Sequence, residues 1–217
     1  MRKFLNLIVA SLALLTASCS KTLINTTESV GTLKAKNSTA TVINEWNSNP
    51  YKLNVIYFVP NDVDSIPNFR KRLSRILLNA QNMFANNMDR EGFSRKSFGL
   101  DLVNDTLINI HYITGQFGKA TYPYSGGNGA VKTEVDAYFG QNPLAKKSEH
   151  NLIIIPTYNT DPANPGGPPF YGTGTSCYAL DYVNLDAKNL GIGGDIGWKA
   201  TVWIGGMIHE LGHGLNA

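Results

Sequence analysis

Cysteine is scarce in this sequence, which has only Cys19 and Cys177 among its 217 residues. Two cysteines do not provide the framework of a small disulfide-rich secreted domain, so the fold must depend on a hydrophobic core. Charged residues are also few, at 16%, and they form no basic run or stripe. The composition therefore argues against a nucleic-acid partner.

The sequence also lacks an apolar run long enough to cross a membrane as a helix. Its longest run, residues 4–17, follows Arg2 and Lys3 and is shorter than the roughly 20 residues that a membrane span requires. A short positive region followed by such a run predicts a secretory signal peptide. The net charge of +3 includes these two basic residues, which would be removed with the signal peptide. The small charge that remains gives no indication of the substrate.

Small residues precede the first cysteine, in the stretch Leu15-Thr16-Ala17-Ser18-Cys19. The stretch resembles the lipobox of bacterial lipoproteins, although Thr16 stands where leucine is usual. The resemblance implies a signal peptide over residues 1–18, lipid on Cys19, and a lipid-anchored location in the bacterial cell envelope, in the outer membrane, facing the periplasm or the surface. An ordinary signal peptide followed by a chance cysteine is the alternative.

After the cysteine the composition changes twice. Residues 19–49 are rich in Ser, Thr and Asn, which predicts a flexible tether. Residues 50–217 then form the expected domain, with buried-strand runs at 53–59, 107–113, 152–155 and 176–183 and helical patterns at 67–88, 131–139 and 198–214. The segment 161–174 is rich in Pro and Gly and is expected to be a loop without helix or strand. This order predicts an α/β fold with a mixed sheet.

The last predicted helix contains the pattern H-E-x-x-H, as His209, Glu210 and His213. Residues four apart lie on one face of a helix, so the two imidazoles can each bring a nitrogen to about 2.0–2.1 Å from one zinc ion. Glu210 lies roughly 100° around the helix, which suits a base that takes a proton from a metal-activated water. Gly205 and Gly206 lie inside the same predicted helix, and each destabilises it by about 1 kcal/mol relative to Ala. Their presence therefore predicts that another backbone packs closely against the helix. A buried helix that carries these residues by chance is the alternative.

The stretch HELGHGLNA resembles the extended metzincin signature, H-E-x-x-H-x-x-G-x-x-H. Asn216 replaces its Gly, and its third His would fall at position 219. With the lipobox, YFVPND at 57–62 and MDREGF at 88–93, the chain is similar to the zinc-dependent metalloproteinase lipoproteins of Bacteroidetes-type bacteria.

This resemblance implies a metzincin-like N-terminal subdomain with a twisted mixed sheet, a long helix and a C-terminal active-site helix. It also implies a Zn²⁺ cofactor on His209 and His213, Glu210 as the general base, and a protein or peptide substrate. The lower subdomain and the third ligand are expected beyond residue 217, so the chain is expected to be C-terminally truncated.

Metzincins bind extended substrates along an edge strand that precedes the active-site helix. The strand-like run in that place is 176–183, so the resemblance assigns substrate binding to a strand with Cys177, Tyr178, Ala179, Leu180 and Asp181.

The function expected from the sequence is therefore that of a membrane-anchored zinc endopeptidase. Two alternatives stay open: a thermolysin-like enzyme with a downstream glutamate ligand, and a catalytically degenerate envelope lipoprotein that binds glycan or peptide. His111 and His150 are expected to be core-edge or surface residues rather than a third ligand, because neither lies in a ligand-like motif.

Overall fold

A computed structural model of the chain describes residues 45–157 and 170–215, which belong to one structural unit, 42–217. Cys19, the expected signal peptide at 1–18 and nearly all of the expected tether at 19–49 lie outside the described residues. Within the described ranges, no helix has the length and apolar character that a membrane crossing requires.

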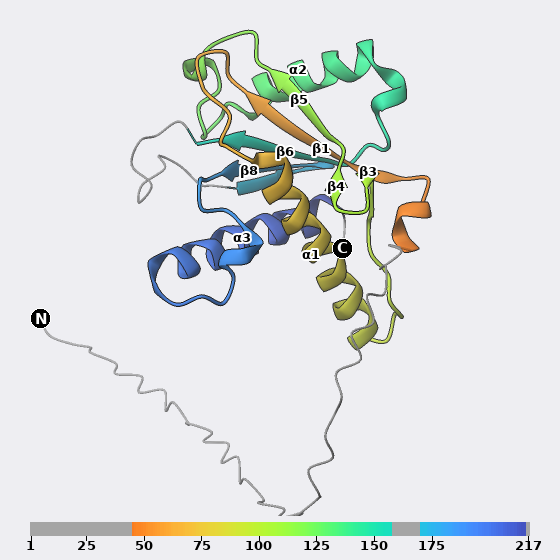
Figure 1. Ribbon diagram of the computed structural model, residues 1–217. Coiled ribbons are helices and arrows are strands. Elements are labelled where there is room, and N and C mark those ends of the chain that lie inside the picture. The colour runs from red at the N-terminus through yellow and green to blue at the C-terminus, as the bar shows by residue number, and fades with distance from the viewer. Residues whose placement is uncertain (1–44, 158–169, 216–217) are drawn as a thin grey trace, which may run out of the picture. The chain divides into compact units, whose positions relative to one another are not determined.

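The main sheet is six-stranded and is built from the buried apolar runs of the sequence (Figure 1). Its strands are β1 (Lys52–Val59), β2 (Gly99–Leu100), β5 (Ile110–Thr114), β6 (Asn151–Pro156), β7 (Phe170–Thr173) and β8 (Ser176–Asp181). The strand order is β2-β1-β6-β8-β7, and β5 also pairs with β1. β7 runs antiparallel to β8, whereas the other pairings are parallel. The prediction of a mixed sheet is thus confirmed.

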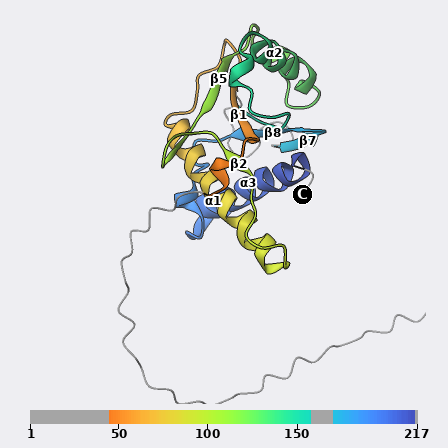
Figure 2. The ribbon, with the colours of Figure 1, turned by 90° about the vertical axis from the view of Figure 1, so that its right-hand side faces the viewer.

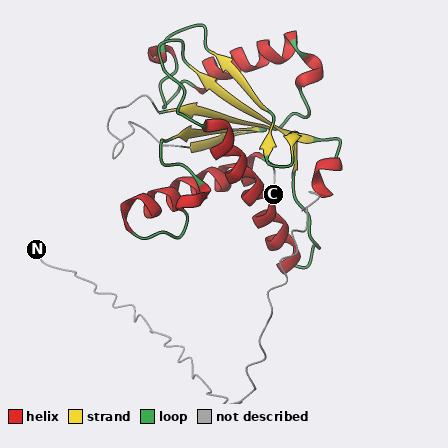
Figure 3. Cartoon of the chain, in the orientation of Figure 1, coloured by secondary structure: helices red, strands yellow, loops and turns green. Residues whose placement is uncertain are grey.

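Helices cover both faces of this sheet. They are α1 (Phe69–Arg90), α2 (Asn128–Gln141) and α3 (Gly194–Gly214). Figures 1 and 2 show α2 on one face and α1 and α3 on the other, and Figure 3 shows the strands between these helices. The buried side of α1 includes Leu73, Ile76 and Leu77, as its three- and four-residue apolar spacing predicts. Each helix therefore buries an apolar face against the sheet.

Smaller elements connect the strands and helices. β3 (Leu102–Asn104) and β4 (Leu107–Ile108) form a two-stranded sheet, and short 3₁₀ helices lie at Glu45–Ser48 (η1), Lys119–Thr121 (η2), Pro143–Ala145 (η3) and Ala187–Asn189 (η4).

Two sequence predictions about the strands require correction. The run 107–113 is divided into β4 and β5, because its first residues pair with β3 rather than with β1. The segment 161–174 is not free of strand, because its last residues form β7; residues 158–169 lie outside the described ranges.

A buried ion pair connects α1 to the end of β8. The Arg72 guanidinium donates to both carboxylate oxygens of Asp181, at 2.8 Å each, and the Asp181 side chain is 0% exposed. Tyr57 of β1 donates its hydroxyl to the same carboxylate at 2.8 Å. Burial raises the pKa of Tyr57 and the Asp181 carboxylate raises it further, so the phenol stays protonated. These contacts fix α1 against the sheet face that also carries α3.

Candidate active site

The predicted motif lies on the last two turns of α3, with its imidazoles on the exposed side. His209 and His213 are exposed and Glu210 is half-buried, whereas Met207 and Leu211 are buried in the core. The Nε2 atoms of His209 and His213 are 3.1 Å apart, and the two rings are perpendicular. The apolar face of α3 therefore anchors the helix while both imidazoles converge on one point.

This spacing fits two ligands of one zinc ion. Zn–N bonds of about 2.0–2.1 Å in a tetrahedral site separate two ligand nitrogens by about 3.3 Å, close to the observed separation. Across residues 45–157 and 170–215, no group of three His, Cys, Asp or Glu side chains is placed to hold a metal ion. The described part of the chain thus contributes a two-histidine donor set.

His111 lies on the opposite face of the sheet from the motif. It is 7% exposed, packs edge-to-face on Phe139 of α2, and approaches the Tyr138 hydroxyl at 3.4 Å. Burial lowers the pKa of His111, which favours the neutral imidazole. It is a core-edge histidine, as expected.

His150 lies just before β6 and contacts the carboxyl end of α3. Its Nδ1 is 2.7 Å from the Gly214 carbonyl oxygen, one of the helix-terminal acceptors that have no partner within the helix. This contact indicates that His150 stabilises the carboxyl end of α3.

The edge-strand prediction for 176–183 is wrong in its choice of strand. β8 lies between β6 and β7, with Cys177 paired to Leu152 on one side and to Gly172 on the other. All five predicted substrate residues, Cys177, Tyr178, Ala179, Leu180 and Asp181, are buried. The strand at the end of the sheet is β7, and within the described ranges no strand pairs with its outer side.

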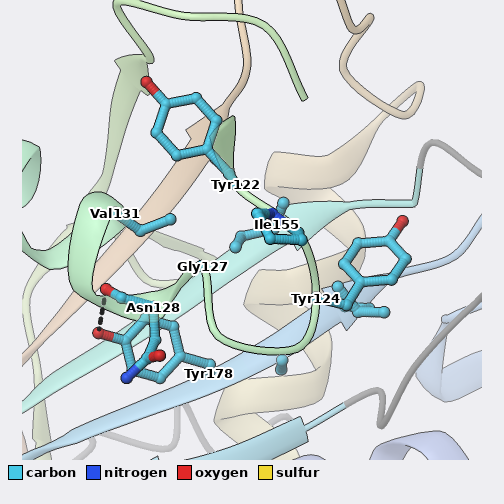
Figure 4. Close-up of a pocket in the computed structure, with 10 residues that line it drawn as sticks. Tyr122, Tyr124, Gly127, Asn128, Val131, Ile155 and Tyr178 are labelled. Atoms are coloured by element: carbon cyan, nitrogen blue, oxygen red, sulfur yellow. Dashed lines mark hydrogen bonds between the residues drawn. The ribbon is translucent and has the colours of Figure 1, made fainter. Parts of the chain in front are cut away.

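The five residues instead contribute to the core on both sides of the sheet. Burial raises the pKa of Cys177 to about 12, with a further contribution from Glu210, so its thiol is unreactive. Tyr178 and Leu180 line a small pocket on the α2 side, together with Tyr122 and Tyr124. In Figure 4 the Tyr178 hydroxyl points to the start of α2, where it donates to the Asn128 carbonyl at 3.3 Å.

β7 passes directly beside the motif. A Cβ atom on Gly172 would lie 3.3 Å from Oε2 of Glu210 and 3.8 Å from Cβ of His213. The edge strand and the candidate general base are therefore in contact, and glycine is the residue at the point of contact.

The sequence does not single out Gly172, because its Pro- and Gly-rich segment predicts a loop without strand. The sequence contains a signal for this strand: Gly174 and Thr175 stand between Phe170-Tyr171 and the run that begins at Ser176. Two residues of this kind between β-forming runs indicate a hairpin, and the register joins Thr173 to Ser176.

No protein-family model matches the chain, and no curated protein matches it. Solved structures do. Two crystal structures of wild-type OgpA from Akkermansia muciniphila are each 44% identical to the chain over 77% of its length, with TM-scores of 0.73 and 0.74. A structure of catalytically inactive OgpA in complex with an O-glycopeptide substrate, glycodrosocin, is 42% identical over 77% of the chain, with a TM-score of 0.74. The chain covers 49% and 48% of these OgpA chains, about half their length. It shares the mixed α/β fold of OgpA.

Proposed function

We propose that the chain is the metal-binding part of a metzincin-type zinc endopeptidase. The observation that carries the proposal is the pair of imidazole nitrogens 3.1 Å apart on α3, with Glu210 between them in sequence and beside an edge strand. The 44% identity to OgpA, an enzyme with a glycopeptide substrate, supports it.

Each residue of the motif has one chemical task in this proposal. His209 and His213 hold the ion through Nε2. A bound zinc ion would supply Lewis-acid chemistry, since it polarises a carbonyl oxygen and makes water acidic enough to attack. The Glu210 carboxylate accepts a proton from the attacking water as the carbon–oxygen bond forms. Glu210 then returns the proton to the leaving amine as the carbon–nitrogen bond breaks.

The substrate is proposed to be an extended peptide that pairs with the outer side of β7. An edge strand presents unpaired backbone donors and acceptors, which favour the addition of a strand. Because β7 contacts Glu210, a peptide on this edge lies close to the general base. The O-glycopeptide bound to OgpA makes an O-glycosylated peptide the first substrate to test.

The lipid anchor is part of the same proposal and rests on sequence alone. The stretch LTASC at 15–19 supports lipid on Cys19, and the polar residues at 19–49 support a tether between the membrane and the domain. The enzyme would then act in the bacterial cell envelope.

A binding protein with the same fold is the second candidate. It is kept by one departure from the extended metzincin signature, in which Asn216 replaces the Gly. Such a protein would bind a glycan or a peptide without cleaving it.

The substitution Glu210→Gln in the full-length protein separates these candidates. The amide is nearly isosteric and both histidines remain, so zinc content measured by elemental analysis should not change. Cleavage of an O-glycopeptide, followed by mass spectrometry, should fall about 10²–10⁴-fold, because a general base typically contributes this much. A wild-type protein that binds zinc and glycopeptide but yields no cleavage product would favour the binding protein.

A further inference from the structure

Gly172 lies so close to Glu210 that a side chain at position 172 would be crowded by the Glu210 carboxylate. A methyl group on Gly172 would meet Oε2 of Glu210 at 3.3 Å, and the backbone oxygen of Glu210 at 3.9 Å. The nearest atom is the far end of a flexible side chain, so the chain can accept a methyl group there by moving the carboxylate. The structural cost of that movement is small, but it changes the position of the atom that takes the proton.

The carboxyl end of α3 has contacts of its own that hold it beside the hairpin. The carboxyl end of α3 packs on β8, where a Cβ atom on Gly214 would lie only 3.3 Å from Sγ of Cys177. Its last turn is also held by His150, whose Nδ1 lies 2.7 Å from the Gly214 carbonyl oxygen. Two contacts therefore fix α3 next to the hairpin.

The register of the hairpin gives Gly172 a fixed direction as well. Gly172 pairs with Cys177 across the antiparallel ladder, and the partners in such a pair face the same side of the sheet. Cys177 contacts α3, so any side chain at position 172 is directed at α3. The first atom that such a side chain meets is Oε2 of Glu210.

We propose that Gly172 is a positioning residue, which sets the place of the Glu210 carboxylate by having no side chain. The inference rests on the proposed peptidase function. A shift of about 1 Å in a reacting group costs on the order of 10²-fold in rate, so the few tenths of an ångström forced by alanine reduce kcat by about three- to tenfold. Valine at the same position reduces kcat further.

The test compares Gly172→Ala and Gly172→Val with wild-type protein in the zinc-loaded state. The expected result is a stepwise fall in kcat with KM unchanged within about twofold. The visible spectrum of the cobalt-substituted protein, which reports on the histidine ligands, should stay the same. Gly140→Ala is the matched control, because no atom lies within 4 Å of a Cβ placed there; its kcat should equal that of wild type. Unchanged kcat in both Gly172 variants would overturn the proposal, and so would a fall accompanied by metal loss or a lower melting temperature.

A double variant separates positioning from general damage. Aspartate at position 210 has a side chain one methylene shorter, so its carboxylate does not reach the position of the Glu210 Oε2 that a Cβ at position 172 would meet. In a Glu210→Asp background, Gly172→Ala should therefore reduce kcat by a smaller factor than it does in wild type, whereas equal losses would contradict positioning.

If Glu210→Gln abolishes cleavage and Gly172→Ala leaves kcat unchanged, only the positioning role is rejected. If Glu210→Gln stays fully active, the peptidase proposal and the positioning role both fail.

Discussion

At the scale of single residues, buried charged side chains such as Asp181 support the fold, whereas the exposed His209 and His213 are proposed to hold the metal. The sequence contains one strong chemical pattern, H-E-x-x-H, and the positions of His209, Glu210 and His213 agree with it because i and i+4 residues share a helix face. The resemblance to metzincins predicts a substrate-binding role for Asp181, yet its side chain is buried in an ion pair with Arg72. Its partner lies 109 positions away in sequence, so no local pattern indicates the pair.

Asp181→Asn should therefore destabilise the protein rather than change its substrate affinity. The amide keeps the shape but leaves the buried Arg72 guanidinium without a counter-charge, which typically costs about 3–5 kcal/mol. Denaturant unfolding measures this loss. Lys132→Ala is the control, since it breaks an exposed ion pair with Asp136 on α2 and should cost less than about 1 kcal/mol. A raised KM at unchanged stability would return Asp181 to the substrate site.

At the scale of elements, the sequence predicts those whose side chains repeat with a clear period. β1, β6, α1 and the active-site helix are confirmed close to their expected ranges. The sequence did not reveal that β7 covers the outer side of β8, since strand order depends on contacts between distant segments. The sequence predicts close backbone approach at Gly205 and Gly206, yet Gly205 is exposed with no atom within 4 Å of a Cβ placed there. On α3 the close approaches occur at Gly197, where a Cβ would meet the Ile192 backbone, and at Gly214, where it would meet Sγ of Cys177.

The carboxyl end of α3 should depend on His150, which the sequence did not mark as important. His150→Ala removes the contact with the Gly214 carbonyl and should cost about 0.5–1.5 kcal/mol of folding free energy, the usual contribution of one hydrogen bond. Because His213 lies in the same last turn, zinc affinity should fall as well. Both effects are measurable, by thermal unfolding and by competition with a chelator. His150→Gln retains a side-chain donor and should recover part of each loss; an alanine variant with unchanged zinc affinity would show that the contact does not support the site.

At the scale of the whole molecule, the proposed function combines a catalytic unit with a lipid-bearing terminus. The described residues begin at 45, some 26 positions after Cys19. In the proposed arrangement, the lipid on Cys19 and the catalytic unit belong to one chain, so the enzyme acts while attached to the membrane.

The lipid anchor makes a prediction about where the protein is found in cells. A single acyl chain gives only marginal membrane binding, and stable attachment takes at least two hydrophobic signals. In the proposed lipoprotein the lipid is attached to Cys19, so loss of this cysteine removes the anchor. Cys19→Ala should move the full-length protein from the membrane fraction to the soluble fraction, as measured by fractionation and immunoblotting. Cys177→Ala is the matched control, because Cys177 is 1% exposed and no lipid can reach it; this variant should stay with the membrane. If the Cys19 variant remained in the membrane fraction in the same amount, the apolar run at 4–17 or another part of the protein would have to hold it there, and the lipoprotein proposal would be wrong.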